Sequence, residues 1–134
     1  MATISAIRDG LKTRLATITS LHAYDVLPDN LVVPAAIVRP LRGDYYSTLT
    51  NKPTDQFEIL VLVALARLST GQDALDPYLS ATGASSIGAA IEGDPTLGST
   101  VDGTLVMGWR DYGGVVIGGV EYLGVRLDVE VING

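Results

Sequence analysis

The longest apolar stretch of the chain lies between residues 56 and 68, with the sequence QFEILVLVALARL. From Phe57 to Leu65 only Glu58 is not apolar. Periodicity alone cannot assign so short a run to a helix or a strand. The β-branched residues, the missing helix cap and the turn-rich flanking sequence favour a strand. Both of its faces are apolar. We therefore expect a central strand, covered by helices on one side and by more protein, such as another subunit, on the other.

Two segments carry a helical period. Apolar residues recur at helical spacing over residues 3–19, with charges on the other side, which predicts an amphipathic first helix packed on the sheet. A second helical segment is expected over 72–92, in two pieces (72–82 and 85–92) broken near Gly83. Pro77 is expected to be tolerated only within the first turn of a helix.

The remaining periodic segments alternate as strands do. The cleanest alternation is the last strand, in which residues 123, 125, 127, 129 and 131 share one apolar face. Pro34 predicts that the strand at 31–38 lies at an edge or carries a bulge, and Pro40 is expected to end it. The glycine pairs at 113–114 and 118–119 predict a hairpin, and residues 41–55 a long loop or an extended hairpin arm.

Together these elements predict one α+β domain over residues 1–134. Its antiparallel sheet of four to five strands carries the N-terminal helix and the second helical segment on one face. The expected strands lie near 23–26, 31–38, 56–66, 101–112 and 115–132.

Composition narrows the classes of function. The net charge is −6, and the nine Lys and Arg residues are scattered singly, which argues against direct, stable DNA binding. No apolar run is long enough to span a membrane, and the N-terminus has no signal-peptide pattern. The chain contains no cysteine, which favours a reducing cytoplasm.

The search for catalytic chemistry finds no motif. His22 is the single histidine, so a pair of imidazole ligands cannot form. The carboxylate pairs Asp73/Asp76 and Asp128/Glu130 are typical of solvated faces. We therefore expect no catalytic, metal or cofactor site.

Tyr, Trp and Arg residues outside the apolar segments are candidates for contact with another protein, since these residue types dominate binding hot spots. Trp109 and its neighbours could equally seal the end of the sheet. The candidate subunit or partner interface residues are Arg42, Asp44, Tyr45, Tyr46, Lys52, Trp109, Arg110, Tyr112, Tyr122 and Arg126.

Four segments carry a resemblance to a known family. They are ISAIRDGLKTRLATI followed by YDVLPD, FEILVLVA, LDPYLSATGASSIGAAIEGD, and YGGVVIGGVEYLGVRLDVEV. In order and size they resemble the small tail terminator proteins of long-tailed phages of actinobacteria, which are similar to the lambda-type tail terminator family. The likeness spans nearly the whole chain and includes no reactive residue.

The resemblance implies a structural virion protein, assembled in the host cytoplasm. Such a protein forms a hexameric ring on the head-proximal end of the tail tube, stops tube polymerisation and joins the tail to the neck or connector proteins. It needs no membrane, and DNA passes through the ring without specific binding. On this view Asp102, Asp111, Asp128 and Glu130 are candidates to line the channel.

Two alternatives remain open. The chain could be a neighbouring head–tail adaptor of the same particle. It could instead be a small-ligand-binding or enzymatic domain that uses a cleft beside Trp109 and Tyr112.

Overall fold

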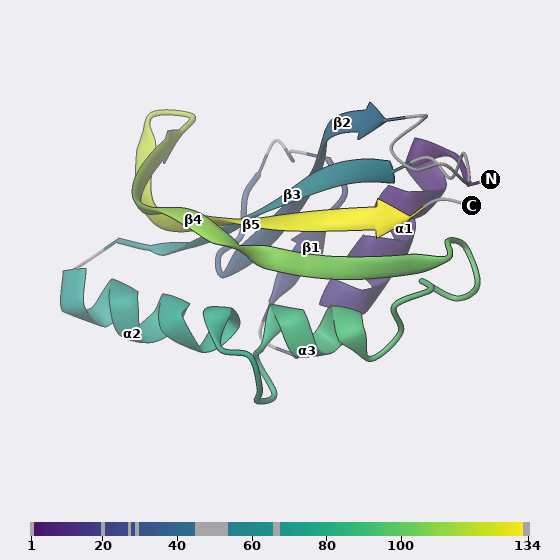
Figure 1. The fold of residues 1–134 in the computed structure, drawn as a ribbon. Coiled ribbons are helices and arrows are strands. Elements are labelled where there is room, and N and C mark those ends of the chain that lie inside the picture. The colour runs from purple at the N-terminus through teal and green to yellow at the C-terminus, as the bar shows by residue number, and fades with distance from the viewer. Residues whose placement is uncertain are drawn as a thin grey trace.

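The computed structural model describes residues 2–19, 21–26, 28, 30–44, 54–65 and 68–132. These residues form a five-stranded sheet and three helices, so the α+β fold is confirmed (Figure 1). Along the chain the elements are α1 (Ile4–Leu15), β1 (His22–Tyr24), β2 (Ala35–Asp44), β3 (Thr54–Ala64), α2 (Leu68–Leu79), α3 (Ile87–Glu92), β4 (Gly103–Ile117) and β5 (Val120–Ile132).

The strand order is β1-β2-β3-β5-β4, which places β3 at the centre of the sheet as expected. The pairs β2–β3, β3–β5 and β5–β4 are antiparallel. The pair β1–β2 is parallel, so the sheet is mixed and the expectation of a wholly antiparallel sheet is wrong at this edge. The connection between β1 and β2 brings the chain back, so that β2 runs in the same direction as β1 where the two strands pair.

The prediction that the strand after Pro34 lies at an edge or carries a bulge holds in its second form, whereas the prediction that Pro40 ends this strand is wrong. Strand β2 begins directly after Pro34, runs through Pro40 and lies between β1 and β3, so it is not an edge strand. Pro40 is tolerated because β1 pairs only with residues 35–37, which leaves one side of β2 without a described partner strand at position 40. The register shifts between Pro40 and Arg42, as a bulge at Leu41 requires.

The final hairpin turns later than the sequence suggested. Strand β4 continues through Gly113 and Gly114, and the turn is made by Gly118 and Gly119 alone. Both turn residues have positive φ (59° and 79°), a conformation that glycine adopts without strain.

The helices are displaced from their predicted bounds. Helix α1 ends at Leu15 rather than 19, and α2 begins at Leu68 rather than 72. As a result Pro77 lies in the last turn of α2, and the expectation that it is tolerated only within the first turn of a helix is wrong. Only a bond near the helix end is lost there, and buried Leu75 and Tyr78 hold this turn against the core.

All three helices pack on one side of the sheet, which we call the covered face. Its core joins α1, α2 and α3 to the odd-numbered positions of β3 and β5. The opposite side, the open face, carries Glu58, Leu60, Leu62 and the even-numbered positions of β5. The expectation that β3 is buried on both faces holds on the open face for Leu62, whereas Leu60 is half-buried and Ala64 is exposed.

Leu62 is buried on the open face because the final hairpin covers it. Figure 1 shows the tip of the β4–β5 hairpin bent away from α2 and α3. Gly124 lies opposite Leu62 in the register, and a Cβ there would lie 2.9 Å from both Leu62 and Val115. The missing side chain at Gly124 therefore leaves room for Leu62 and Val115.

Candidate interaction surface

A buried carboxylate lies at the middle of the open face. The side chain of Glu58 is 4% exposed and contacts three guanidinium groups from three strands. Its Oε2 lies 3.1 Å from Nη2 of Arg39, and its Oε1 lies 2.8 Å from Nη2 of Arg110 and 3.2 Å from Nε of Arg126. The register explains the meeting, because Arg39 lies directly opposite Glu58 on β2, whereas Arg126 of β5 lies opposite the next open-face residue of β3 and pairs with Arg110 of β4.

Two further carboxylates complete this group. Nε of Arg110 donates to both oxygens of Asp128, at 3.2 and 3.1 Å, and its Nη1 donates to Asp111 at 2.7 Å. Hydrogen bonds to Asp128 and Asp111 raise the pKa of Arg110 above its ordinary value. We call Arg39, Glu58, Arg110, Asp111, Arg126 and Asp128 the Glu58 cluster; its three cations and three anions cancel.

A bulge in β4 brings Asp111 into the cluster. The register jumps from Arg110–Arg126 to Gly113–Gly124, so two residues of β4 face a single residue of β5. Asp111 has a φ of 56°, in the left-handed region. Arg110 and Asp111 therefore both reach the open face, and Nη1 of Arg126 lies 3.7 Å from Asp111. Tyr112, next in sequence, lies on the covered side.

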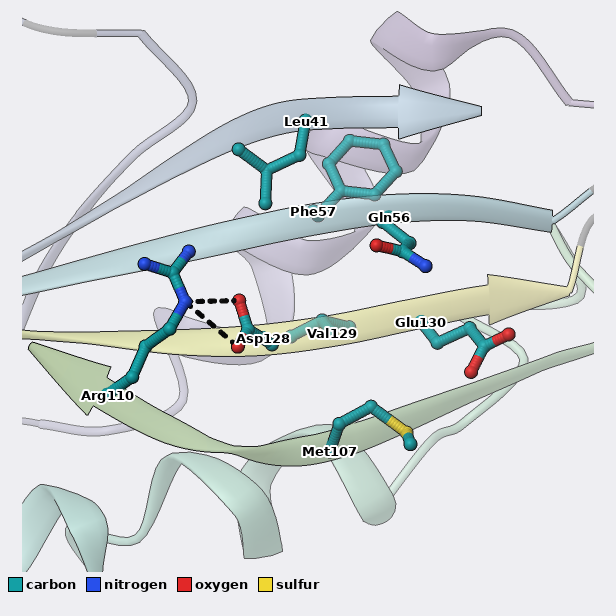
Figure 2. Close-up of a pocket in the computed structure, with 8 residues that line it drawn as sticks. All are labelled: Leu41, Gln56, Phe57, Met107, Arg110, Asp128, Val129 and Glu130. Atoms are coloured by element: carbon teal, nitrogen blue, oxygen red, sulfur yellow. Dashed lines mark hydrogen bonds and ion pairs between the residues drawn. The ribbon is translucent and has the colours of Figure 1, made fainter. Parts of the chain in front are cut away.

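A hollow of about 400 Å³ adjoins the cluster on the open face (Figure 2). Leu41 and Met107 lie on its two sides, each at a register shift, in β2 and β4 respectively. Arg110 and Asp128 bound one end of the hollow, and Gln56 and Glu130 lie along it. It is an open groove with mixed polar and apolar walls.

Strand β4 forms an edge of the sheet and exposes large apolar side chains. Leu105, Met107 and Trp109 are 53%, 62% and 54% exposed, and Val116 is exposed near the hairpin tip. Soluble proteins seldom expose several large apolar side chains along one strand unless they contact another molecule. Strand β4 contains neither Lys nor Pro, two residues that commonly prevent an edge strand from pairing with another chain.

Trp109 and Tyr112 connect this edge to α2. Their ring centroids lie 6.0 Å apart, and the Tyr112 hydroxyl donates to Oδ1 of Asp76 at 2.7 Å. The pKa of Tyr112 is raised to about 12, chiefly by partial burial and next by this hydrogen bond. The hollow described above lies on the other face, so these two rings do not line it.

The predicted interface residues fall into separate places. Arg110 and Arg126 meet in the Glu58 cluster, whereas Trp109 and Tyr112 lie on the covered side. Arg42 is exposed on β2, and Tyr122 is half-buried on β5. Residues Tyr45, Tyr46 and Lys52 lie outside the described residues, as does the side chain of Asp44. An interface role for these residues stays a prediction.

The candidate channel residues are also divided. Asp111 and Asp128 are paired with arginines in the cluster. Glu130 lines the groove, and Asp102 precedes β4, where its N–H donates to the carbonyl of Ile132. Two of the four carboxylates are thus neutralised within the chain, and their place in a channel stays a prediction.

Sequence reasoning missed Glu58 and Arg39 as members of a site. The available signal was the single charge inside an apolar strand, since a buried carboxylate requires a partner. His22 is exposed on β1. Within the described ranges, no cluster of His, Cys, Asp or Glu could hold a metal ion. None of the helices described is long and apolar enough to cross a membrane.

Comparison with known proteins adds no relative. No protein-family model matches this chain, and no curated protein matches it. Function is therefore inferred from the geometry above and from the segment pattern of the sequence.

Proposed function

We propose that this chain is a structural virion protein of the tail terminator type. Copies of it form a ring, of six subunits in the related family, on the head-proximal end of a phage tail tube. The ring stops growth of the tube and presents a surface to the neck or connector proteins. The protein has no catalytic role in this proposal and uses no cofactor.

The observation that supports this proposal best is the edge strand β4. It is 15 residues long and carries four exposed large apolar side chains, Leu105, Met107, Trp109 and Val116. Its two charged residues, Arg110 and Asp111, are paired within the Glu58 cluster, so they do little to repel an approaching chain. A protein that terminates a polymer needs such a surface for its neighbours.

The charge of the chain fits the passage of DNA. Attraction to phosphate depends on a surplus of Lys and Arg, and this chain has a net charge of −6. The three arginines gathered on the open face are each paired with carboxylates. DNA could then slide through the ring without being held.

The test is a tube-growth assay with the purified chain and a purified tail tube protein. We expect a stoichiometric amount of the chain to stop elongation and to appear in electron micrographs as a ring at one end. The Trp109→Asp variant should lose this effect. The Thr19→Asp variant, which adds the same charge at an exposed position outside β4, should keep it. The proposal would be overturned if tubes keep growing in the presence of the wild-type chain, whether or not the chain binds to the tube away from its end. Binding of the chain to neck proteins but not to the tube would indicate an adaptor.

A further inference from the structure

The outer edge of β4 has no neighbouring strand among the described residues. Proteins commonly protect such an edge with Lys, Pro, other charged side chains or bulges, because its unpaired N–H and C=O groups can pair with another chain. The two bulges of β4 interrupt the edge within residues 103–112. Residues 113–117, with the sequence GGVVI, pair with β5 in regular register and contain none of these protective features. We call this piece of β4 the GGVVI edge.

The two sides of the GGVVI edge differ in chemistry. On the open face, Val115 lies opposite the half-buried Tyr122, so this side is mainly apolar. On the covered side, Val116 is 68% exposed and lies opposite Glu121. Oε1 of Glu121 lies 2.9 Å from the point that a Cβ would occupy at Gly114. The missing side chain at Gly114 therefore leaves a carboxylate above the backbone of the edge, with room beside it.

Further carboxylates lie on the covered side next to this edge. Tyr112, the residue before the GGVVI edge, donates its hydroxyl hydrogen bond to Asp76 of α2. Asp73 precedes Asp76 by three residues on the same helix, and both line one hollow on the surface of α2. Three carboxylates, those of Asp73, Asp76 and Glu121, thus belong to the covered side of this region.

No nearby cation balances these carboxylates. Arg110 and Arg126 are the only cations in residues 68–132, and both are paired within the Glu58 cluster on the open face. Within the described part of the chain, neither Asp73 nor Glu121 forms an ion pair. The covered side of the GGVVI edge is therefore negative, whereas its open-face side is apolar.

We propose that the GGVVI edge binds an extended segment of another protein, which adds to β4 as a further strand. The side chains of an extended segment point alternately to opposite faces. A segment with Lys or Arg at every second position would direct these cations toward Glu121 and Asp76. Apolar residues at the positions between them would lie beside Val115. The main-chain hydrogen bonds supply affinity, and the alternate side chains supply specificity.

A second copy of this chain is a poorer occupant of the edge. If two β4 edges paired about a two-fold axis, the Glu121 side chains of both copies would lie on the same side of the joined sheet. Like charges would then face one another, which opposes this arrangement. The GGVVI edge also contains no cation that could reach the carboxylates of its partner. A basic and apolar segment has the charge that is missing.

This inference goes beyond the proposed function. It assigns a mode of contact and the chemistry of the partner segment, and neither depends on a tail tube.

The test uses a fluorescent eight-residue peptide of alternating lysine and valine, blocked at both ends, whose binding is measured by fluorescence anisotropy. We expect saturable binding to the wild-type chain, and hydrogen–deuterium exchange should show added protection within residues 113–117. The same peptide with glutamate in place of lysine should not bind. A peptide methylated on every amide nitrogen keeps its charges and apolar side chains but has no backbone N–H donor, and it should not bind either.

A variant of the chain tests the charge of the covered side. Glu121→Lys should weaken binding of the lysine–valine peptide at least about fivefold, because it places a cation where the peptide brings its own. The matched control is Asp9→Lys, which makes the same change of net charge at an exposed position of α1 and should bind as the wild type does. The circular dichroism spectra of both variants should match that of the wild type. If Glu121→Lys misfolds, the comparison of the three peptides on the wild type decides the question.

Several results would overturn the inference. Equal weakening by Glu121→Lys and Asp9→Lys would mean that only net charge matters. Added protection confined to residues outside 113–117, or equal binding of the methylated peptide, would exclude strand addition at this edge. Protection of 113–117 that rises with the concentration of the chain alone would identify a second copy as the occupant.

Failure of the proposed function is separate. If no peptide binds, the inference fails, while the tube-growth assay with the Trp109→Asp variant still decides the capping role. If the peptide binds as expected while tubes grow unimpeded, the inference stands and the capping role fails.

Discussion

The two faces of β3 are stabilised by different forces. On the covered face, Phe57, Ile59 and Val61 are fully buried against the helices, and the driving force is removal of apolar surface from water. On the open face, Glu58 is buried by contact with three arginines, and the stabilisation depends on atom-to-atom geometry. One strand therefore joins a face that tolerates approximate packing to a face that depends on its register.

The largest effect should come from the covered face. Phe57→Ala removes the largest fully buried side chain and should lower the free energy of unfolding by about 3–5 kcal/mol. Urea unfolding followed by circular dichroism measures this change. Leu105→Ala, at an exposed position of β4, should change it by less than about 0.5 kcal/mol. Similar losses for the two variants would mean that the core is not where the structure has it.

On the open face, Glu58→Gln should lower the free energy of unfolding by about 1–3 kcal/mol, because three guanidiniums lose the anion that they share. The loss is smaller than for Phe57 because the arginines are partly exposed and can be rehydrated. Glu130→Gln makes the same chemical change on the same face, where Glu130 forms no ion pair with a described residue, and should be nearly neutral. Equal unfolding midpoints for both variants would contradict the cluster.

A difference of similar size should separate two glycines that face each other across β4 and β5. At Gly124 an added Cβ lies 2.9 Å from Leu62 and Val115, whereas at Gly113 nothing lies within 4 Å. Gly124→Ala should therefore be less stable than Gly113→Ala by about 1–3 kcal/mol in thermal unfolding. The reverse order would argue against coverage of Leu62 by the hairpin.

The smallest effect concerns Tyr112, where β4 meets α2. Its pKa is raised from 10.0 to about 12, so its contribution to stability is complete below pH 10 and is lost as the pH rises toward 12. An ultraviolet titration of tyrosinate, with Tyr112→Phe as the reference, should place its ionisation above that of an ordinary tyrosine. Asp76→Asn should lower the pKa of Tyr112 only in part, because burial is the larger cause. A Tyr112 that titrates normally would contradict the link to α2.

The sequence was sufficient where structure follows from periodicity. The alternation of β5 predicted its covered face, and the apolar run at 57–65 predicted the central strand. The sequence was insufficient where the structure of a strand depends on which other strand pairs with it. Pro40 was expected to end β2, but its effect depends on how far β1 extends, and the parallel direction of β1 depends on a connection without periodicity.

The same limit applies to the candidate site. The sequence indicated four of these residues for two separate reasons. It indicated Arg110 and Arg126 as contacts with a partner, and Asp111 and Asp128 as the lining of a channel. The structure joins them around Glu58, which the sequence presented only as an exception in an apolar run. Their meeting depends on the register of three strands and on a bulge at Asp111, and neither is encoded by local spacing.

The bulges of β4 also have a consequence for chain length. Strand β4 has 15 residues and β5 has 13, and the two register shifts, near Met107 and at Asp111–Tyr112, accommodate the difference. Removing one residue at either shift would straighten the strand and leave every other pairing in place. Removing one residue elsewhere would shift the register as far as the next bulge, and every side chain in that stretch would then point to the opposite face. Natural or engineered variants of this hairpin should therefore gain or lose residues at these two points and nowhere else along the strand.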